Sequence, residues 1–206
     1  GTHTVKASIA ETTNYNAGEA TATFTITAAT MTVTAEGYSG TYDGKAHGIT
    51  ISAPEDATVM YGTQEGKYDL TESPTYTDAD TYIVYYQVTM DNYNTFTGSA
   101  TVDISKADIT PTVSLEGWTY GTTAKSPSVT GNTGEGTVTY TYQAEGAEIF
   151  TETMPEVVGT HTIKASIAET TNYNAGEATA TFTITAATMT VTARGYEGTY
   201  DGKAHG

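Results

Sequence analysis

The sequence predicts an all-β protein built from tandem β-sandwich modules. Two observations carry this prediction. The 206-residue chain contains 47 Thr and 16 Tyr, and these residue types favour pleated, half-buried strands over helices. Short segments also alternate between apolar and polar residues, with turn-forming residues at spacings of roughly 8–12 residues, a pattern typical of sandwiches.

One stretch of the chain occurs twice. Residues 1–48 and 159–206 differ only where Val5 becomes Ile163, Glu36 becomes Arg194 and Ser39 becomes Glu197. Self-similarity at a fixed period, here 158 residues, indicates a tandem array. Each period holds two related units. We therefore predict four parts: the closing portion of a second-type unit (residues 1–28), a first-type unit (29–107), a second-type unit (108–187) and the start of another first-type unit (188–206).

The first part is predicted to be a hairpin with one apolar face. Its two strands alternate, and an Asn-Tyr-Asn-Ala-Gly turn at residues 14–18 joins them. The apolar positions are Val5, Ala7, Ile9, Ala22, Phe24 and Ile26. An isolated hairpin is marginal in water, so we expect this face to meet another chain or a continuation of the array.

The first-type unit contains five predicted strands, at residues 31–35, 49–52, 58–61, 78–88 and 100–104. Turn clusters are predicted at residues 37–44 and 62–66, and Pro54 ends the second strand. The strand at 78–88 has the strongest alternation, which predicts that Tyr82, Val84, Tyr86 and Val88 face the core.

The second-type unit echoes the first. Residues 112–118 match residues 32–38, Val138 and Tyr140 match Val59 and Tyr61, and the Asn-Tyr-Asn at 172–174 matches that at 92–94. The junction at residues 104–109 carries no flexible linker. A connection this short restricts rotation and predicts modules stacked end to end.

Two motifs resemble a known class of repeats. Thr-Tyr-Asp-Gly-Lys-Ala-His-Gly at residues 41–48 is similar to YDG-type repeats, and Trp-Thr-Tyr-Gly-Thr at residues 118–122 to YGX-type (MBG) repeats. Both belong to bacterial extracellular surface proteins, and the resemblance covers essentially the whole chain. It implies β-rich modules at the cell surface or cell wall, without catalytic residues.

The module fold is predicted to be immunoglobulin-like. Residues 78–84 resemble a tyrosine corner, with Val84 where an antibody domain has Cys, whereas the second-type unit places His161 at the position of Tyr82. A β-grasp-like module is the alternative, although no segment with helical periodicity is available to cover its sheet.

Charge and composition exclude several partners. The formal net charge is −16, from 8 Lys and Arg against 24 Asp and Glu, which disfavours binding to nucleic acid and to anionic lipid. The absence of Cys excludes disulfides and thiolate metal sites. No apolar run approaches the ~20 residues of a membrane helix, so membrane insertion is not expected.

No catalytic, cofactor-binding or metal site is predicted, and the chain is not expected to be an enzyme. His3, His47, His161 and His205 lack a neighbouring second ligand. Asp78 with Asp80, or Asp91 with Asn92 and Asn94, could offer oxygens to calcium, but Asx turns explain them more simply. A stiffening isopeptide crosslink could start from Lys45, Lys106, Lys125 or Lys164, yet no acceptor motif is visible.

These features predict a structural tandem-repeat segment that acts as a stiff stalk or spacer of an extracellular surface protein. Its partners would be neighbouring repeats or other copies of the chain. The alternative is an adhesive module that binds a host glycan or protein, which should expose an aromatic or apolar patch.

Overall fold

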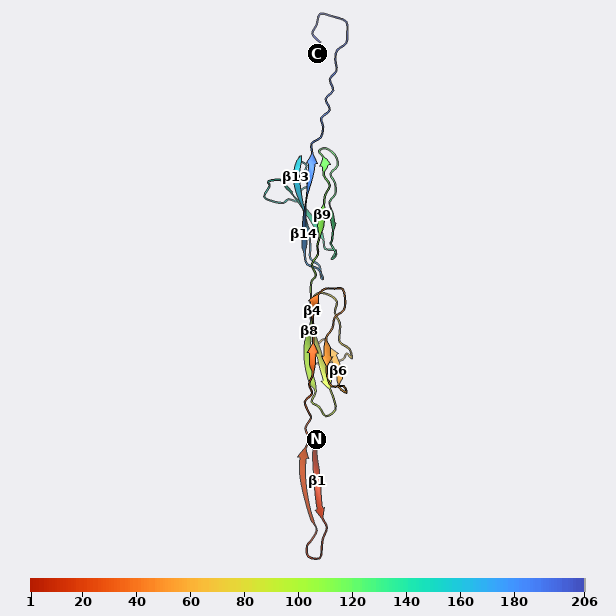
Figure 1. The fold of residues 1–206 in the computed structure, drawn as a ribbon, viewed down its shortest axis with the longest axis vertical. Helices are drawn as coiled ribbons and strands as arrows, with labels where there is room; N and C mark the ends of the chain where they lie inside the picture. The colour runs from red at the N-terminus through yellow and green to blue at the C-terminus, as the bar shows by residue number, and fades with distance from the viewer. Residues whose placement is uncertain (206) are drawn as a thin grey trace. The chain divides into compact units, whose positions relative to one another are not determined.

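The computed structural model describes residues 1–205, which form fourteen β-strands and no helix (Figure 1). The chain divides between Ala107 and Asp108 into two compact units. The all-β prediction is therefore confirmed. No helix in the described part of the chain is long and apolar enough to cross a bilayer.

The first sandwich pairs a four-stranded sheet with a two-stranded sheet. The order in the larger sheet is β4 (Tyr38–Thr41), β8 (Phe96–Ser105), β7 (Thr81–Thr89) and β6 (Thr58–Gly62). The smaller sheet holds β3 (Thr34–Glu36) and β5 (Thr50–Ser52). Neighbouring strands are antiparallel except β4 and β8, which run parallel.

The second sandwich repeats this topology. Its larger sheet has the order β10 (Trp118–Thr119), β14 (Gly176–Thr185), β13 (Gly159–Ile167) and β12 (Val138–Ala144), and its smaller sheet holds β11 (Ser128–Thr130) and β9 (Thr112–Ser114). In both sandwiches the last two strands of the unit occupy the centre of the larger sheet. The first strand of each unit lies in the smaller sheet and the second lies in the larger sheet. This immunoglobulin-like arrangement confirms the predicted module fold. The β-grasp alternative is wrong, because no helix covers a sheet within residues 1–205.

One predicted turn cluster contains a strand. We expected residues 37–44 to be a turn, but Tyr38–Thr41 forms β4 and pairs with β8 from Val102 to Ser105. Gly37 allows the backbone before β4 to approach β8 closely, because a Cβ at this position would collide with the carbonyl oxygen of Thr101. Gly117 allows the equivalent close approach to the carbonyl oxygen of Thr183 in the second sandwich.

The core of the first sandwich follows the predicted alternation of β7. Val84, Tyr86 and Val88 are buried, Tyr82 is half-buried, and Ile83 points to solvent. These side chains pack with buried residues of β8 and of the loops that precede the strands, namely Met31, Ile49, Val102 and Ile104. The register of this strand is therefore as predicted.

The core of the second sandwich is centred on Phe182 of β14. The ring centroid of Phe182 lies 5.4 Å from that of Trp118 and 6.4 Å from that of Tyr142. The remaining buried residues of this core are Val113, Leu115, Ile163, Ala165 and Ile184. Trp118 and Val113 come from the start of the unit, so this core joins the two ends of its sequence.

The repeated ends of the chain differ from their counterparts. β1 (Thr2–Ile9) and β2 (Gly18–Thr25) form the predicted N-terminal hairpin, a two-stranded sheet by itself within the described residues. Every residue of both strands is exposed. Residues 186–205 hold no strand, although they match residues 28–47, which contain β3 and β4.

We predict that Tyr82→Ala destabilises the first sandwich by about 3 kcal/mol, the lower end of the aromatic-to-alanine range, because the side chain is only half-buried. Tyr82→Phe should cost about 1 kcal/mol, since it removes only the phenol hydrogen bond. Ile83→Ala is the matched exposed control. Urea unfolding measures these changes, and a larger cost for Ile83→Ala than for Tyr82→Ala would contradict the register.

Candidate functional site

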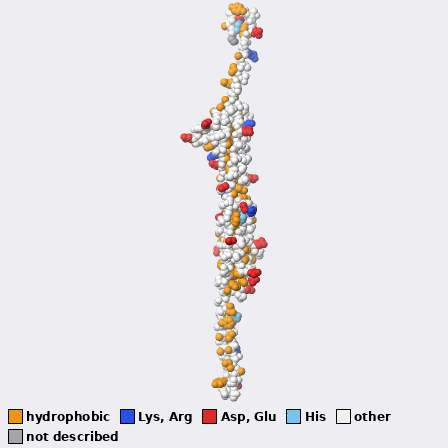
Figure 2. Space-filling model, in the orientation of Figure 1, with side chains coloured by type: hydrophobic (Ala, Val, Ile, Leu, Met, Phe, Trp, Pro, Cys, Tyr) orange, Lys and Arg blue, Asp and Glu red, His pale blue; other side chains and the backbone are white. Residues whose placement is uncertain are grey.

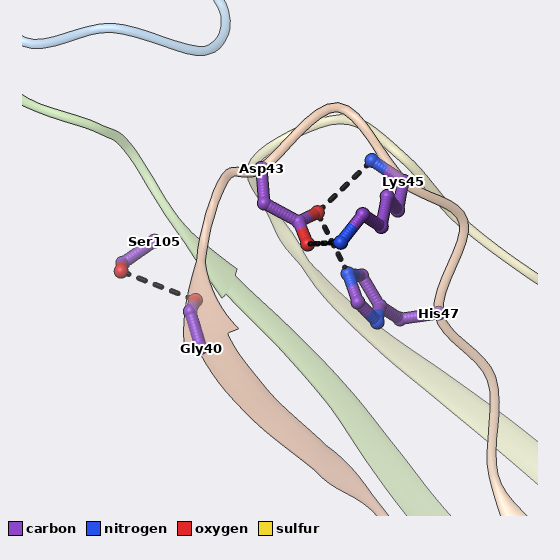
Figure 3. Close-up of polar contacts among 5 residues, drawn as sticks. All are labelled: Gly40, Asp43, Lys45, His47 and Ser105. Atoms are coloured by element: carbon purple, nitrogen blue, oxygen red, sulfur yellow. Dashed lines mark hydrogen bonds and ion pairs between the residues drawn. The ribbon is translucent and has the colours of Figure 1, made fainter.

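The YDG motif forms a compact hydrogen-bonded turn (Figure 3). One carboxylate oxygen of Asp43 accepts the backbone N–H of Lys45 and the ring N–H at Nε2 of His47, each at 2.9 Å. The other oxygen lies 3.6 Å from Lys45 Nζ. Gly44 adopts a φ of 75° between them, a conformation that glycine reaches without a steric penalty.

An aromatic stack ties this turn to the larger sheet. The rings of His47 and Tyr38 lie 3.7 Å apart at an interplanar angle of 10°, and Tyr38 begins β4. The hydrogen bond from His47, supported by the Lys45 N–H, lowers the pKa of Asp43 below its ordinary value. The motif therefore works as a structural clasp.

The clasp forms again near the C-terminus. His205 Nε2 lies 2.7 Å from Asp201, and the His205 ring stacks on Tyr196 at 3.7 Å. No strand is present around these residues. Ten consecutive residues, 38–47 or 196–205, are thus sufficient to place the histidine, the aspartate and the tyrosine together.

A tyrosine corner is present in the first sandwich, as predicted. The Tyr82 hydroxyl donates to the carbonyl oxygen of Asp78 at 3.3 Å, and the Tyr82 ring stacks on Tyr76 at 3.9 Å. Burial, together with the nearby Asp80 and Asp78 carboxylates, raises the pKa of Tyr82.

His161 performs the same task in the second sandwich, which the sequence alone did not reveal. Its Nε2 lies 2.8 Å from the carbonyl oxygen of Val157, also four residues upstream. A carbonyl only accepts, so Nε2 carries the proton. The side chain is buried, and Nδ1 has no hydrogen-bond partner among the described residues. The sequence feature that could have indicated this role is the alignment of His161 with Tyr82.

The candidate calcium residues act within local structure. Asp80 accepts the backbone N–H of Thr81 at 2.8 Å, and the Thr81 hydroxyl donates to Asp103 at 2.7 Å. Asn92 occupies a turn position with a φ of 67°. Among residues 1–205, no group of three or more His, Asp or Glu side chains could hold a metal ion.

The Asn-Tyr-Asn loops clamp the start of each sandwich. The Asn94 side-chain amide donates to the carbonyl oxygen of Ala28 at 3.4 Å, and its backbone N–H donates to Ala29 at 2.8 Å. In the second sandwich the Asn174 amide donates to the Asp108 carboxylate at 2.8 Å. The sequence identified these loops as turns but not as clamps.

Two of the four candidate crosslinking lysines lie in ion pairs. Lys164 Nζ is 3.2 Å from Glu177, which also accepts the Ser166 hydroxyl at 2.9 Å. The hydrogen bonds from Ser166 and Lys164 lower the pKa of Glu177. Lys45 belongs to the clasp. The isopeptide crosslink stays a prediction.

A surface hollow of about 500 Å³ opens beside the start of the second sandwich. Trp118, Tyr120, Met154, Pro155 and Glu156 are among its lining residues. An aromatic surface next to a carboxylate is a combination that small polar ligands with apolar faces can use. Tyr120 is well exposed, whereas Trp118 also packs on the core.

The N-terminal hairpin exposes side chains whose counterparts are buried. Phe24 is 50% exposed whereas Phe182 is 4% exposed, and Ile9 is 74% exposed whereas Ile167 is 2% exposed. Figure 2 shows hydrophobic side chains along this hairpin. The two hairpins have the same register, with His3 opposite Phe24 and His161 opposite Phe182. They differ in what covers them.

Comparisons with known proteins show distant likeness. No family model matches the sequence, and no curated protein matches it. A SusE-like, surface-located polysaccharide-binding protein from the heparin utilisation locus of Bacteroides thetaiotaomicron matches at 9% identity and a TM-score of 0.28 over 75% of this chain; the match spans 34% of that protein.

Two further solved structures match over similar shares of the chain. A chimeric titin Z1Z2 carrying a decorin peptide matches at 16% identity, over 78% of this chain and 100% of that one. Drosophila N-cadherin EC1-3 matches at 12% identity, over 72% and 63%. Both TM-scores are 0.28, and likeness of this degree says nothing about a ligand.

We predict that the Asp43 clasp contributes a pH-dependent part of the stability of the first sandwich. A carboxylate with a lowered pKa stabilises the fold above its ordinary pKa, and this contribution is lost as the pH falls through the lowered value. Asp43→Asn should therefore flatten the fall in unfolding free energy between about pH 5 and pH 2. Asp56→Asn, an exposed acid outside the clasp, is the control. Equal slopes for Asp43→Asn and wild type would contradict the assignment.

We predict that alanine substitution of the repeated histidine lowers the free energy of unfolding much more at His161 than at His3. His161→Ala should destabilise the second sandwich by about 2–4 kcal/mol, because it removes a buried ring and its hydrogen bond. His3→Ala should change unfolding free energies by less than about 0.5 kcal/mol, since His3 is exposed. Thermal or urea unfolding of each variant measures both, and equal effects would refute the assigned role of His161.

Proposed function

We propose that the chain is a spacer: a structural tandem-repeat segment that holds other domains away from a bacterial cell surface. The observation that carries this proposal is the near-exact duplication of residues 1–48 at residues 159–206. Copying whole periods is a simple way to change the length of a stalk.

The anchoring of the junction supports a stiff spacer. On one side, the Ser105 carbonyl accepts the Tyr42 N–H at 2.8 Å and the Ser105 hydroxyl donates to Gly40 at 3.2 Å, as Figure 3 shows for the second contact. On the other side, Asp108 is held by Asn174. Only two residues separate these anchored positions, which leaves little chain to act as a hinge.

Location and charge are consistent with this role. The resemblance to YDG-type and YGX-type repeats supports an extracellular, cell-surface or cell-wall position. The net charge of −16 makes neighbouring copies repel one another and keeps an exposed stalk soluble.

We predict a narrow distribution of distances between the two sandwiches. The chain has no Cys, so Thr97→Cys with Thr179→Cys, both at exposed positions, allows spin labels to be placed cleanly. Pulsed electron paramagnetic resonance should give a single narrow peak. Six Gly and Ser residues inserted after Ala107 should broaden it. An equally broad distribution in both chains would refute the stiff spacer.

The adhesive alternative rests on the hollow at Trp118 and Tyr120. Stacking on an exposed aromatic ring is a common way to hold an apolar face of a ligand. The full chain can be tested on arrays of glycans and matrix proteins, with Tyr120→Ala as the matched variant. Reproducible binding that Tyr120→Ala abolishes would favour adhesion over the spacer, and no binding would favour the spacer.

A further inference from the structure

The hollow beside Trp118 has a counterpart in the first sandwich. The Tyr42 N–H donates to the carbonyl oxygen of Ser105, and the Tyr120 N–H donates to that of Thr185, each at 2.8 Å. Ser105 and Thr185 are the last residues of β8 and β14, which occupy the same place in their sheets. The segments that follow Tyr42 and Tyr120 are therefore equivalent.

In the first sandwich a histidine ring fills this place. His47 exchanges two backbone hydrogen bonds with Tyr76, at 2.9 and 2.8 Å. Its ring stacks on Tyr38, and its Nε2–H donates to Asp43 (Figure 3). The side chain of His47 is only 17% exposed. The place therefore takes a flat ring that stacks on an aromatic face and donates to a carboxylate.

The second sandwich has no such ring. His47 lies five residues after its tyrosine, whereas the fifth residue after Tyr120 is Lys125, which is exposed and does not line the hollow. Pro155 does line it, and Pro155 precedes the corner histidine by six residues, as Tyr76 precedes the corner tyrosine. The hollow of about 500 Å³ therefore corresponds to the place that His47 fills.

The lining of the hollow keeps the chemistry of the clasp with different residues. Trp118 and Tyr120 supply aromatic rings, Met154 supplies a thioether, and Glu156 supplies a carboxylate. None of the lining residues, all within residues 118–156, is basic, and the net charge of the chain is −16. Aromatic faces attract cations, and a carboxylate forms a charge-assisted hydrogen bond with a cationic N–H. This combination selects a cation over an anion.

We propose that the hollow is a binding site for a small molecule that carries a flat nitrogen cation, such as an imidazolium group. The cation stacks on Trp118 and donates an N–H to Glu156, as His47 does with Tyr38 and Asp43. The volume of about 500 Å³ suits a small molecule, whose sites measure roughly 300–1,000 Å³. The site shares its hollow with the adhesive alternative and does not depend on the spacer role.

The test is a titration of the full chain with histamine at about pH 5.5, where an imidazole ring is largely protonated. Trp118 is the only Trp of the chain, so its fluorescence reports on the hollow directly. We expect a saturable change with one histamine per chain and a dissociation constant on the order of 1 mM or below. Phenethylamine has the same ammonium group but a benzene ring without N–H groups, and it should bind about tenfold more weakly.

Two matched variants identify the carboxylate. Glu156→Gln should weaken histamine binding about tenfold or more, because the charge-assisted hydrogen bond is lost. Glu152→Gln makes the same change of charge in the same loop but outside the lining of the hollow, and it should leave binding unchanged. Both positions are exposed, so neither substitution disturbs the core.

Three results would overturn the proposal: no saturable fluorescence change, equal affinities for histamine and phenethylamine, or equal weakening by Glu156→Gln and Glu152→Gln. None of these results would alter the distance distribution between spin labels. The binding site and the spacer role therefore fail independently.

Discussion

Each sandwich depends on one packing interaction, in which residues from the start of the unit bury the apolar face of its last two strands. β13 and β14 come last in their unit, whereas Trp118 and Val113, which cover them, come first. The core therefore cannot form until the two ends of the unit meet, and such non-local contacts make folding cooperative and comparatively slow. Within the described residues, the N-terminal hairpin has the same register as β13 and β14, but every residue of its strands is exposed.

The hydrogen bond of the tyrosine corner is made by different residue types in the two sandwiches. Tyr82 and His161 have different sizes and different hydrogen-bond donors, yet each reaches a carbonyl oxygen four residues upstream. What both positions require is a ring that fills the end of the core and an N–H or O–H directed at the preceding loop. The histidine meets this requirement although its Nδ1 has no hydrogen-bond partner among residues 1–205, and a buried polar atom without a partner costs free energy.

The clasp and the closing strands represent two levels of organisation. The Asp43 turn and its copy at Asp201 form with the same geometry although only the first is attached to a complete sandwich. The closing strands depend on partners far away in the sequence. In such a repeat protein the turn forms from local sequence alone, whereas the core of each module forms only when all of its strands are present.

The sequence by itself determined the all-β class, the repeat, the approximate positions of most strands and the inward face of β7, because period-two alternation and turn residues are local signals. It placed the start of β3 at residue 31 instead of Thr34 and the start of β8 at residue 100 instead of Phe96. It also located the tyrosine corner at Tyr82. It missed β4, because parallel pairing with β8 depends on a close backbone approach at Gly37 that leaves no local pattern. Only the tertiary structure decided that His161 completes a corner and that Asn94 and Asn174 clamp the starts of their units. These contacts join residues whose meeting depends on how the chain folds back.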